Sequence, residues 1–265
     1  GKFVMSMFSI EPSSLSLSLT LGLTLGLSAC QSLPKQPHLP ESQALSARVE
    51  ALYSDKQTTQ GEPIKTSSTD LVSAISAQND IHPDLSGYHP IVTGANAFAA
   101  RSILTDMATR NIDAQYYIWH NDQAGQLLLK DLWDAAERGV IVRLLLDDFN
   151  NSAKFDQHLL RFASHPNIAV RIINPLMHRK FPTLNYVTGL PRINRRMHNK
   201  SMTFDKQITI IGGRNIGNEY LSNDQSSQFA DLDVLLIGKV VTDIDNSFYD
   251  YWSSPLSFDI ETLAK

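Results

Sequence analysis

The sequence predicts an α/β sandwich, in which helices cover both faces of a central sheet. Strand-like and helix-like segments alternate along the chain from about residue 96, and this alternation is the pattern of α/β architectures. Residues 140–146 read Val-Ile-Val-Arg-Leu-Leu-Leu and are almost continuously apolar, as expected for a strand that is buried on both faces. No internal repeat is visible.

Each predicted element follows from a local pattern. Apolar residues at helical spacing predict helices, β-branched and aromatic runs predict strands, and Gly139 after an amphipathic stretch predicts a helix end. The predicted elements are, in order, a helix over 96–111, a strand over 112–119, a helix over 125–138, a strand over 140–146, a helix over 154–164, a strand over 169–173, a hairpin of strands 202–204 and 208–211, and a strand over 234–237. Asp205-Lys206 is the predicted two-residue turn of the hairpin.

The composition excludes several classes of protein. A chain of 265 residues with 42% hydrophobic residues and a net charge of −4 is not a disordered, collagen-like or polytopic membrane protein. Nucleic-acid binders are normally basic, so the charge argues against a general affinity for nucleic acid. Cys30 is the one cysteine, which excludes an internal disulfide and a zinc cluster of cysteines.

The first 30 residues are predicted to be a signal peptide. Residues 14–29 are uncharged but too short and rich in hydroxyl groups for a spanning helix, which needs about 20 apolar residues; they suit a signal-peptide apolar region. The run ends in Leu-Ser-Ala-Cys30, which resembles the bacterial lipobox and implies lipidation of Cys30. With Gln31 next, the resemblance favours an anchor at the periplasmic face of the outer membrane, with the inner membrane as the alternative. A buried strand is the other interpretation, because Ser/Leu alternation has period two.

The rest of the chain divides into a tether and a domain. Residues 31–79 are rich in Pro, Ser, Thr and Gln, which predicts a flexible polar tether. Residues 80–265 carry the alternating elements and are predicted to form the folded domain. Near its start, His120 and Asp122 either line a cleft or belong to a polar turn, in which Asp122 would cap the next helix.

One stretch, residues 198–215, carries the candidate chemistry. His198 and Lys200 are two residues apart on an extended segment, so their side chains leave the same face of the sheet. An imidazole beside an ammonium is a poor metal site, since zinc needs more His, Cys or carboxylate ligands, but it suits an anion: the ammonium contacts a phosphate oxygen and a neutral imidazole can attack phosphorus. Gly212-Gly213 permits a close backbone approach, and the Asn215 amide can donate to another phosphate oxygen. No metal or cofactor is expected.

Written as a pattern, this stretch is H-x-K-x4-D-x6-G-G-x-N, which resembles the signature of the phospholipase D superfamily. The segments Gln115–Asp122, Arg143–Asp148, Asn194–Ser201, Gly212–Tyr220 and Phe229–Val234 are similar to the bacterial class C cardiolipin synthases of that superfamily. The similarity covers about residues 80–256. It implies a phospholipase D-like α/β/α sandwich with a mixed central sheet, and phosphatidyl transfer through a covalent phosphohistidine without a metal.

The resemblance also implies roles for individual residues. His198 would be the nucleophile or the acid that protonates the leaving oxygen, and Lys200 and Asn215, with Gly213, would bind the phosphoryl oxygens. Asp205 completes the catalytic motif, although we expect it to support the hairpin rather than to react. Asp231 would orient the imidazole and fix its tautomer, with an ordinary strand-end carboxylate as the alternative.

The chain contains one such motif, whereas enzymes of this type carry two. The other H-x-K, at residues 178–180, is followed by Asn185 in place of Asp and by no Gly-Gly-x-Asn. We therefore interpret the chain as an N-terminal half, whose site would be completed by a second half in cis or by a second copy. A group of basic residues surrounds the motif and predicts either a solvated loop or a positive field for anionic lipid: Arg179, Lys180, Arg192, Arg195 and Arg196.

Three hypotheses about function follow. The first is a phosphatidyltransferase of the cardiolipin-synthase type, acting at a membrane surface on phosphatidylglycerol or a similar anionic phospholipid. The second is a phospholipase D-type hydrolase, or a one-motif nuclease that is active as a homodimer. The third is a truncated half-enzyme that folds but turns nothing over.

Overall fold

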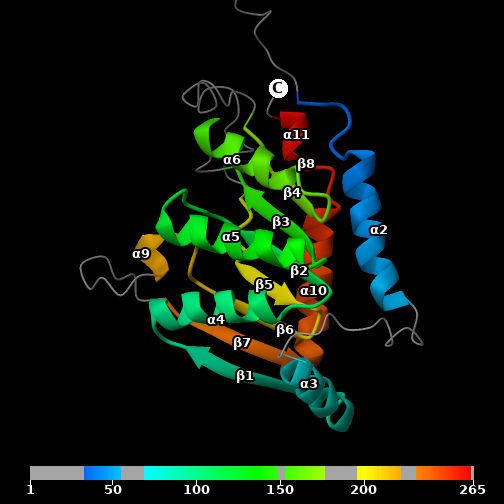
Figure 1. Ribbon diagram of the computed structural model, residues 1–265, viewed down its shortest axis with the longest axis vertical. Helices are drawn as coiled ribbons and strands as arrows, with labels where there is room; N and C mark the ends of the chain where they lie inside the picture. Colours follow the sequence, from blue (N-terminus) through cyan, green and yellow to red (C-terminus); the bar gives the residue numbers. More distant parts are fainter. Residues whose placement is uncertain (1–32, 55–68, 149–152, 177–195, 222–230, 264–265) are drawn as a thin grey trace, which may run out of the picture. The chain divides into compact units, whose positions relative to one another are not determined.

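The computed structural model (Figure 1) describes residues 33–54, 69–148, 153–176, 196–221 and 231–263. Three sequence predictions therefore lie outside the described residues: the signal peptide with Cys30, the H-x-K at residues 178–180, and the basic loop up to Arg195. From residue 34 on, the described residues form one compact unit.

The unit is built on one eight-stranded sheet, in the order β1-β7-β6-β5-β2-β3-β4-β8. The sheet is mixed, as expected: β2, β3 and β4 pair in parallel and the other neighbours are antiparallel. The strands are β1 (Ser86–Ile91), β2 (Asn111–Tyr116), β3 (Ile141–Asp147), β4 (Ile168–Ile173), β5 (Ser201–Phe204), β6 (Ile208–Gly212), β7 (Asp233–Gly238) and β8 (Ser257–Asp259). The helices are α2 (Pro40–Ser54), α3 (Thr69–Ile81), α4 (Gly94–Met107), α5 (Gln123–Glu137), α6 (Ala153–Ala163), α9 (Asn218–Leu221), α10 (Lys239–Trp252) and α11 (Ile260–Leu263).

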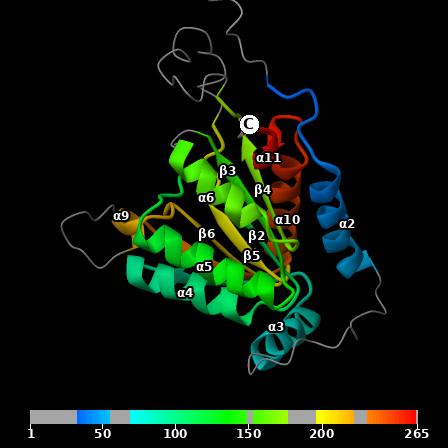
Figure 2. The same cartoon turned by 45° about the horizontal axis from the view of Figure 1, so that its top comes forward.

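Helices cover both faces of the sheet, which confirms the predicted α/β sandwich. Helices α4, α5 and α6 lie on one face, and α10 lies behind the strands (Figures 1 and 2). Leu128, Leu132 and Leu159 of these front helices pack with the sheet residues Leu144 and Ile172 in the larger apolar core. Removing this apolar surface from water, at about 25 cal/mol per Å², is the main force that holds the sandwich together.

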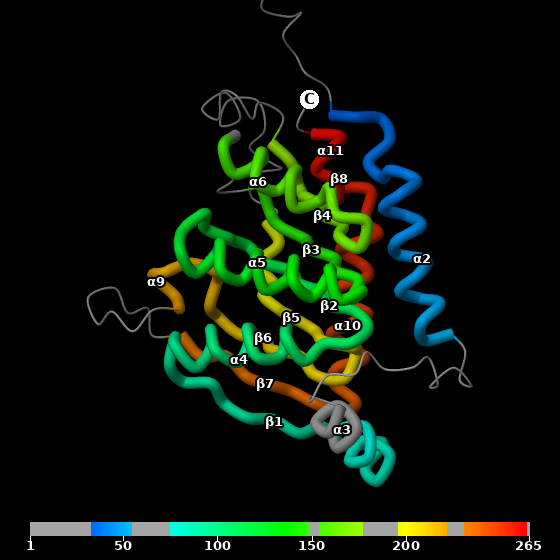
Figure 3. Tube along the Cα trace, in the orientation of Figure 1, coloured from blue at the N-terminus to red at the C-terminus, as the bar shows by residue number. Residues whose placement is uncertain are grey.

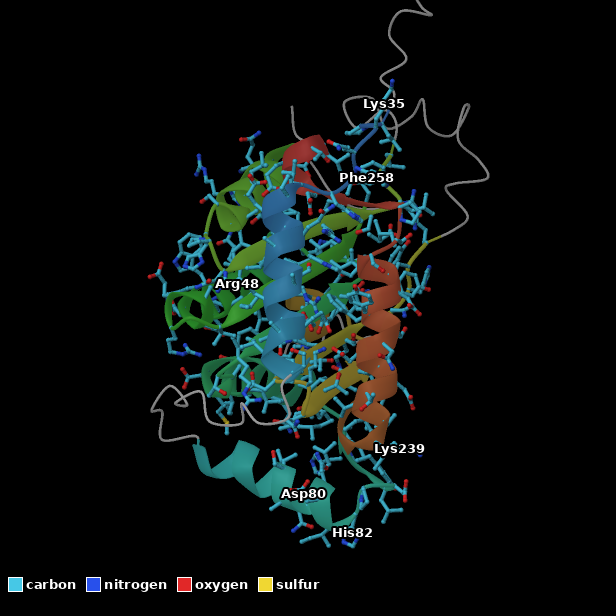
Figure 4. The ribbon with its side chains drawn as sticks, turned by 90° about the vertical axis from the view of Figure 1, so that its right-hand side faces the viewer. Lys35, Arg48, Asp80, His82, Lys239 and Phe258 are labelled. Atoms are coloured by element: carbon cyan, nitrogen blue, oxygen red, sulfur yellow. The ribbon has the colours of Figure 1, made fainter. Side chains whose placement is uncertain are left out.

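The far face of the sheet has a second core, which changes one prediction. Leu45 and Val49 of α2 are buried there with Leu145, Phe248 and Trp252, and Figure 4 shows α2 beside α10 over the strands. The expected tether over 31–79 is therefore wrong for residues 40–54, because these form a helix with a buried apolar stripe. Helix α3 begins within that range and ends just beyond it, at Ile81 (Figure 3). A brief apolar periodicity near residues 44–53 was the one sign of α2 in the sequence.

The hairpin formed as predicted. Strands β5 and β6 pair from Ser201↔Ile211 to Phe204↔Ile208, and the turn residues Asp205 and Lys206 have φ values of 50° and 52°. Two consecutive positive φ values suit the right-handed twist of a hairpin. The strand predicted over 112–119 ends earlier, at Tyr116, and the chain bends at Tyr117. Among the described residues, no helix has the length and apolar character needed to cross a membrane.

Candidate active site

The motif residues gather at one edge of the sheet. This edge is where β2, β3 and β6 end and where β5 and β7 begin, and it lies beside α9 in Figure 1. Because β5 is antiparallel to both of its neighbours, the residues just before β5 meet the residues just after β2 and β6. The topology therefore brings His198 and Lys200 together with Tyr117 and Asn215.

His198 is exposed and lies face to face with Tyr117. The two ring centroids are 4.3 Å apart and the ring planes are inclined by 18°. Lys200 contacts the same group: its Nζ donates to the His198 carbonyl oxygen at 2.8 Å and lies 5.5 Å from the Tyr117 ring centroid. Imidazole, ammonium and phenol ring thus form one cluster, and Tyr117 is a member that the motif did not reveal.

Asp147, at the end of β3, fixes the segment that precedes His198. Its carboxylate accepts hydrogen bonds from the Met197 backbone N–H at 3.0 Å and from the Arg196 guanidinium at 3.0 Å. Burial raises the pKa of Asp147, although the Met197 N–H and Arg196 oppose this shift. The Arg196 side chain is only 5% exposed, so it serves this buried ion pair, which neither of the two interpretations of the basic residues expected.

Asn215 is held at both ends of its amide. The Oδ1 atom accepts a hydrogen bond from the Ile118 backbone N–H at 3.0 Å, and the side chain also bonds to the Tyr220 hydroxyl, which in turn bonds to Glu219. The Glu219 carboxylate lies 3.2 Å from His120 Nε2. Since Oδ1 accepts from Ile118 and one amide N–H is directed at the Tyr220 hydroxyl, the second N–H of Asn215 is the donor left for the predicted phosphate-binding role.

Gly213 contributes space rather than a free donor. A Cβ atom at this position would lie 2.4 Å from Asp231 Oδ1, so a side chain would displace that carboxylate. The Gly213 N–H donates to the Leu232 carbonyl at 3.1 Å and is thus already paired. The lack of a side chain at Gly213 therefore allows the Asp231 carboxylate to lie against the backbone.

Asp231 is electrostatically linked to Lys200. Partial burial lowers the pKa of the Lys200 ammonium, and the Asp231 carboxylate opposes that shift. Within the part of the chain that the structure describes, no hydrogen bond joins Asp231 to His198, so the orienting role stays a prediction. In the same described part, no three His, Cys, Asp or Glu side chains are arranged to hold a metal ion.

Asp205 lies at the other end of β5. Its carboxylate accepts four hydrogen bonds, from the Thr109 N–H and hydroxyl, the Arg110 N–H and the Asn111 N–H, at 2.7 to 3.0 Å. These bonds agree with the expected support of the hairpin. Grouping Asp205 with the reacting residues does not suit this position, because the strand separates it from His198 and its lone pairs are occupied.

A buried polar layer supports the site from beneath. Arg101 donates to the Tyr116 hydroxyl at 2.9 Å and to Asp233 Oδ2 at 2.9 Å, and Asp233 Oδ1 accepts from the Arg214 N–H at 3.3 Å. Asp122 caps α5 by accepting from the Gly125 N–H at 3.0 Å, as one of the two interpretations expected, and also accepts from the Asn218 N–H at 2.7 Å. The capping signal was readable in the sequence, but the Arg101–Asp233 pair was not.

The fold and the site together define a phospholipase D-like domain, and comparison with known proteins places it in a family. A family model described as the PLD-like domain of cardiolipin synthase matches residues 103–252. The chain belongs to this family, as the motif predicted.

Several curated proteins are similar to this chain. Cardiolipin synthase C of Escherichia coli K12 is 47% identical over 182 residues, which are 69% of this chain and 38% of that protein. An uncharacterized protein of Helicobacter pylori J99 is 40% identical over 173 residues, which are 64% of this chain and 34% of that protein. The chain therefore spans little more than a third of the length of these relatives.

Solved structures are similar in fold. Phosphatidylserine synthase of Haemophilus influenzae Rd KW20 superposes with a TM-score of 0.52 at 16% identity, over 72% of this chain and 43% of that one. Nuc of Salmonella typhimurium, a phospholipase D family member, gives a TM-score of 0.48 at 16% identity, over 66% of this chain and 98% of that one.

Proposed function

We propose that this chain is the His-Lys half-site of a phosphatidyltransferase of the cardiolipin-synthase type. The observation that carries the proposal is the cluster at the sheet edge, where the exposed His198 ring lies beside Lys200. The similarity to Cardiolipin synthase C supports a phospholipid substrate. A phosphodiester is the chemical class that fits an imidazole nucleophile beside an ammonium.

The proposed reaction has two balanced steps. In the first, a ring nitrogen of His198 attacks phosphorus; a P–N bond forms, the P–O bond to the leaving alcohol breaks, and an acid gives that oxygen a proton. In the second, an acceptor alcohol attacks phosphorus, its proton goes to the conjugate base, the P–N bond breaks and His198 is regenerated. The acid/base group would come from a second motif, in a longer chain or in a second copy.

Lys200 and Asn215 would stabilise the charge that builds up on the phosphoryl oxygens in both steps. The Lys200 ammonium supplies a point charge, and the fixed Asn215 amide supplies a donor whose direction is set before the substrate binds. Partial burial of Lys200 strengthens its attraction for an anion, because the effective dielectric constant is lower there than in water.

We also propose that the chain acts at a membrane surface to which Cys30 attaches it. The support is the lipobox-like sequence before Cys30. Labelling of the bacterial protein with radioactive palmitate, compared with a Cys30→Ala variant, tests the anchor. Label that persists in the variant would rule out lipidation at Cys30.

The test of the function uses the 265-residue chain with vesicles of phosphatidylglycerol and mass spectrometry of the lipid products. We expect diphosphatidylglycerol and glycerol, and no product with His198→Ala. Phosphatidic acid without diphosphatidylglycerol would identify a hydrolase instead, and cleavage of DNA without lipid turnover would identify a nuclease. No turnover of either substrate would leave a half-enzyme that needs the absent motif.

A further inference from the structure

Tyr117 is the side chain that connects the two reactive members of the motif. Its ring lies 4.3 Å from the His198 ring and nearly parallel to it, and the Lys200 ammonium lies 5.5 Å from its centroid. Within the described residues, no hydrogen bond to the His198 ring is present. The stacking is therefore the contact that holds this exposed imidazole.

The backbone on both sides of Tyr117 is fixed. The preceding residue, Tyr116, is fully buried, and its hydroxyl accepts a hydrogen bond from Arg101 at 2.9 Å. The following residue, Ile118, donates its N–H to Asn215 Oδ1 at 3.0 Å. Tyr117 thus sits at a bend whose direction is set by the buried layer below and by the phosphate-binding amide above.

The Tyr117 hydroxyl lies within electrostatic reach of Asp147 and Arg196. Burial and the Asp147 carboxylate raise the pKa of the Tyr117 hydroxyl, whereas Arg196 opposes the shift. Asp147 and Arg196 are the ion pair that anchors the backbone before His198. The same ion pair therefore lies within electrostatic reach of the Tyr117 hydroxyl and also anchors the backbone that carries His198.

Stacking is a suitable way to hold a nucleophilic imidazole. A hydrogen bond would occupy one of the ring nitrogens, whose lone pairs and protons lie in the plane of the ring. A contact with the ring face leaves both nitrogens at the free edge and still restricts rotation of the side chain. Aromatic pairs of this kind contribute about 0.5–1.5 kcal/mol beyond their buried area.

We propose that Tyr117 is a positioning residue for His198, holding the imidazole by its face so that a ring nitrogen points towards the bound phosphodiester beside Lys200. The proposal rests on the proposed function for its catalytic consequence. The stacking itself does not depend on the proposed function and can be measured without turnover.

The first experiment measures the stacking by nuclear magnetic resonance on the 265-residue chain. The ring protons of His198, assigned by their loss in His198→Gln, are expected upfield of those of an unstacked histidine because they lie over the Tyr117 ring. Tyr117→Phe should keep this displacement, and Tyr117→Leu should abolish it. Tyr88→Leu, at an exposed tyrosine on edge strand β1, is the matched control. An unmoved His198 signal in Tyr117→Leu would overturn the proposal.

The second experiment measures cleavage of bis(p-nitrophenyl) phosphate. We expect kcat to fall by about 10- to 100-fold in Tyr117→Leu, with KM changed by less than about twofold, because a misaligned nucleophile slows the reaction step. Tyr117→Phe should restore kcat to within about threefold. Tyr117→Met, which keeps the bulk without the aromatic face, replaces the leucine variant if that one is not folded by circular dichroism.

The outcomes separate the inference from the proposed function. An inactive wild type contradicts turnover by this chain, and the resonance measurement alone then decides about Tyr117. An active wild type with unchanged kcat in Tyr117→Leu overturns the positioning role. A rise in KM alone would assign Tyr117 to substrate binding, and equal losses in the Phe and Leu variants would assign the effect to the hydroxyl; either result overturns the proposal.

Discussion

The two ends of strand β5 carry different parts of one motif, and their side chains lie in opposite environments. At its start, the His198 side chain is exposed and the Lys200 side chain has its ammonium near a carbonyl oxygen and an aromatic ring. At its end, the Asp205 carboxylate is buried and accepts four hydrogen bonds from residues 109–111. Five residues on from Lys200, the motif thus changes from an exposed side chain to a buried carboxylate whose lone pairs are all used in hydrogen bonds.

One sequence motif can therefore include residues that face a substrate and residues that stabilise the fold. Free ring nitrogens and a free ammonium are expensive to bury, so groups that must meet a substrate stay near the surface. A carboxylate that accepts several N–H groups fixes the register of two segments that are far apart in sequence. We therefore expect substitutions at the two ends of β5 to affect different properties, activity at one end and stability at the other.

The largest effect on activity is expected for His198→Ala. Phosphodiester turnover should fall by at least about 10³-fold, since no other group forms the P–N bond. The free energy of unfolding should change by less than about 1 kcal/mol, because the side chain is exposed. Steady-state kinetics and urea titrations check both. His89→Ala, at an exposed histidine on β1, is the control; equal losses of turnover in the two variants would refute the assignment.

Asp205→Ala should have the opposite profile. It leaves three backbone N–H groups and one hydroxyl without their acceptor, and each unpaired buried group costs about 1–3 kcal/mol. We expect the free energy of unfolding to fall by about 3–5 kcal/mol, measured by urea titration. Asp205→Asn retains one acceptor oxygen and should lose less. A loss below about 1 kcal/mol in the alanine variant would show that Asp205 does not anchor the hairpin.

Gly213→Ala tests whether the lack of a side chain at Gly213 is needed to leave room for the Asp231 carboxylate. The new Cβ would lie 2.4 Å from Asp231 Oδ1, so that carboxylate must move and its position relative to Lys200 changes. Turnover should fall by about 10-fold. In the double variant with Asp231→Gly, the loss should be no larger than in Asp231→Gly alone, because the two residues act together. Additive losses would mean that Gly213 acts independently of Asp231.

The pH dependence of activity should report Lys200. Its pKa is lowered by burial, and the proposed phosphate contact needs the protonated form, so kcat/KM should begin to fall below the ordinary lysine value of about 10.5. Asp231→Asn removes the carboxylate that raises this pKa and should move the alkaline limb to lower pH. Asp84→Asn, at an exposed carboxylate, should leave it in place.

Replacing Lys200 with arginine completes this test. Lys200→Arg should shift the alkaline limb to higher pH while most turnover is lost, because the guanidinium differs in size and donor geometry. An alkaline limb that does not respond to either Asp231→Asn or Lys200→Arg belongs to another group.

The smallest effect is expected for Tyr220→Phe. The change removes the hydroxyl that bonds the Asn215 amide but leaves the bond from the Ile118 N–H. A single neutral hydrogen bond contributes about 0.5–1.5 kcal/mol, so kcat/KM should fall by roughly 2- to 10-fold. Asn215→Ala should cost more, and Tyr88→Phe, at an exposed tyrosine, should cost nothing. Equal losses of kcat/KM in Tyr220→Phe and Tyr88→Phe would show that the Tyr220 hydroxyl plays no part in the site.

The sequence determined the local structure and the identity of the motif. The hairpin follows from two apolar strands around Asp205-Lys206, and the cap of α5 follows from Asp122, because turns and caps depend on neighbouring residues. The spacing of His198, Lys200 and Asn215 was enough to indicate the family. Composition misled for α2: residues 44–53 show a brief apolar periodicity, but the polar surroundings favoured a tether over a helix that packs Leu45 on the sheet.

Tertiary structure decided which side chains meet around that motif. Tyr117 and Asp147 reach His198 and its backbone from two other strands, and Asp231 reaches Gly213 from a third. These contacts join residues far apart in the chain, and they depend on strand order and register, which no local pattern encodes. The sequence by itself thus specified the motif residues, whereas packing of the sheet edge decided what contacts the His198 ring and what shifts the pKa of Lys200.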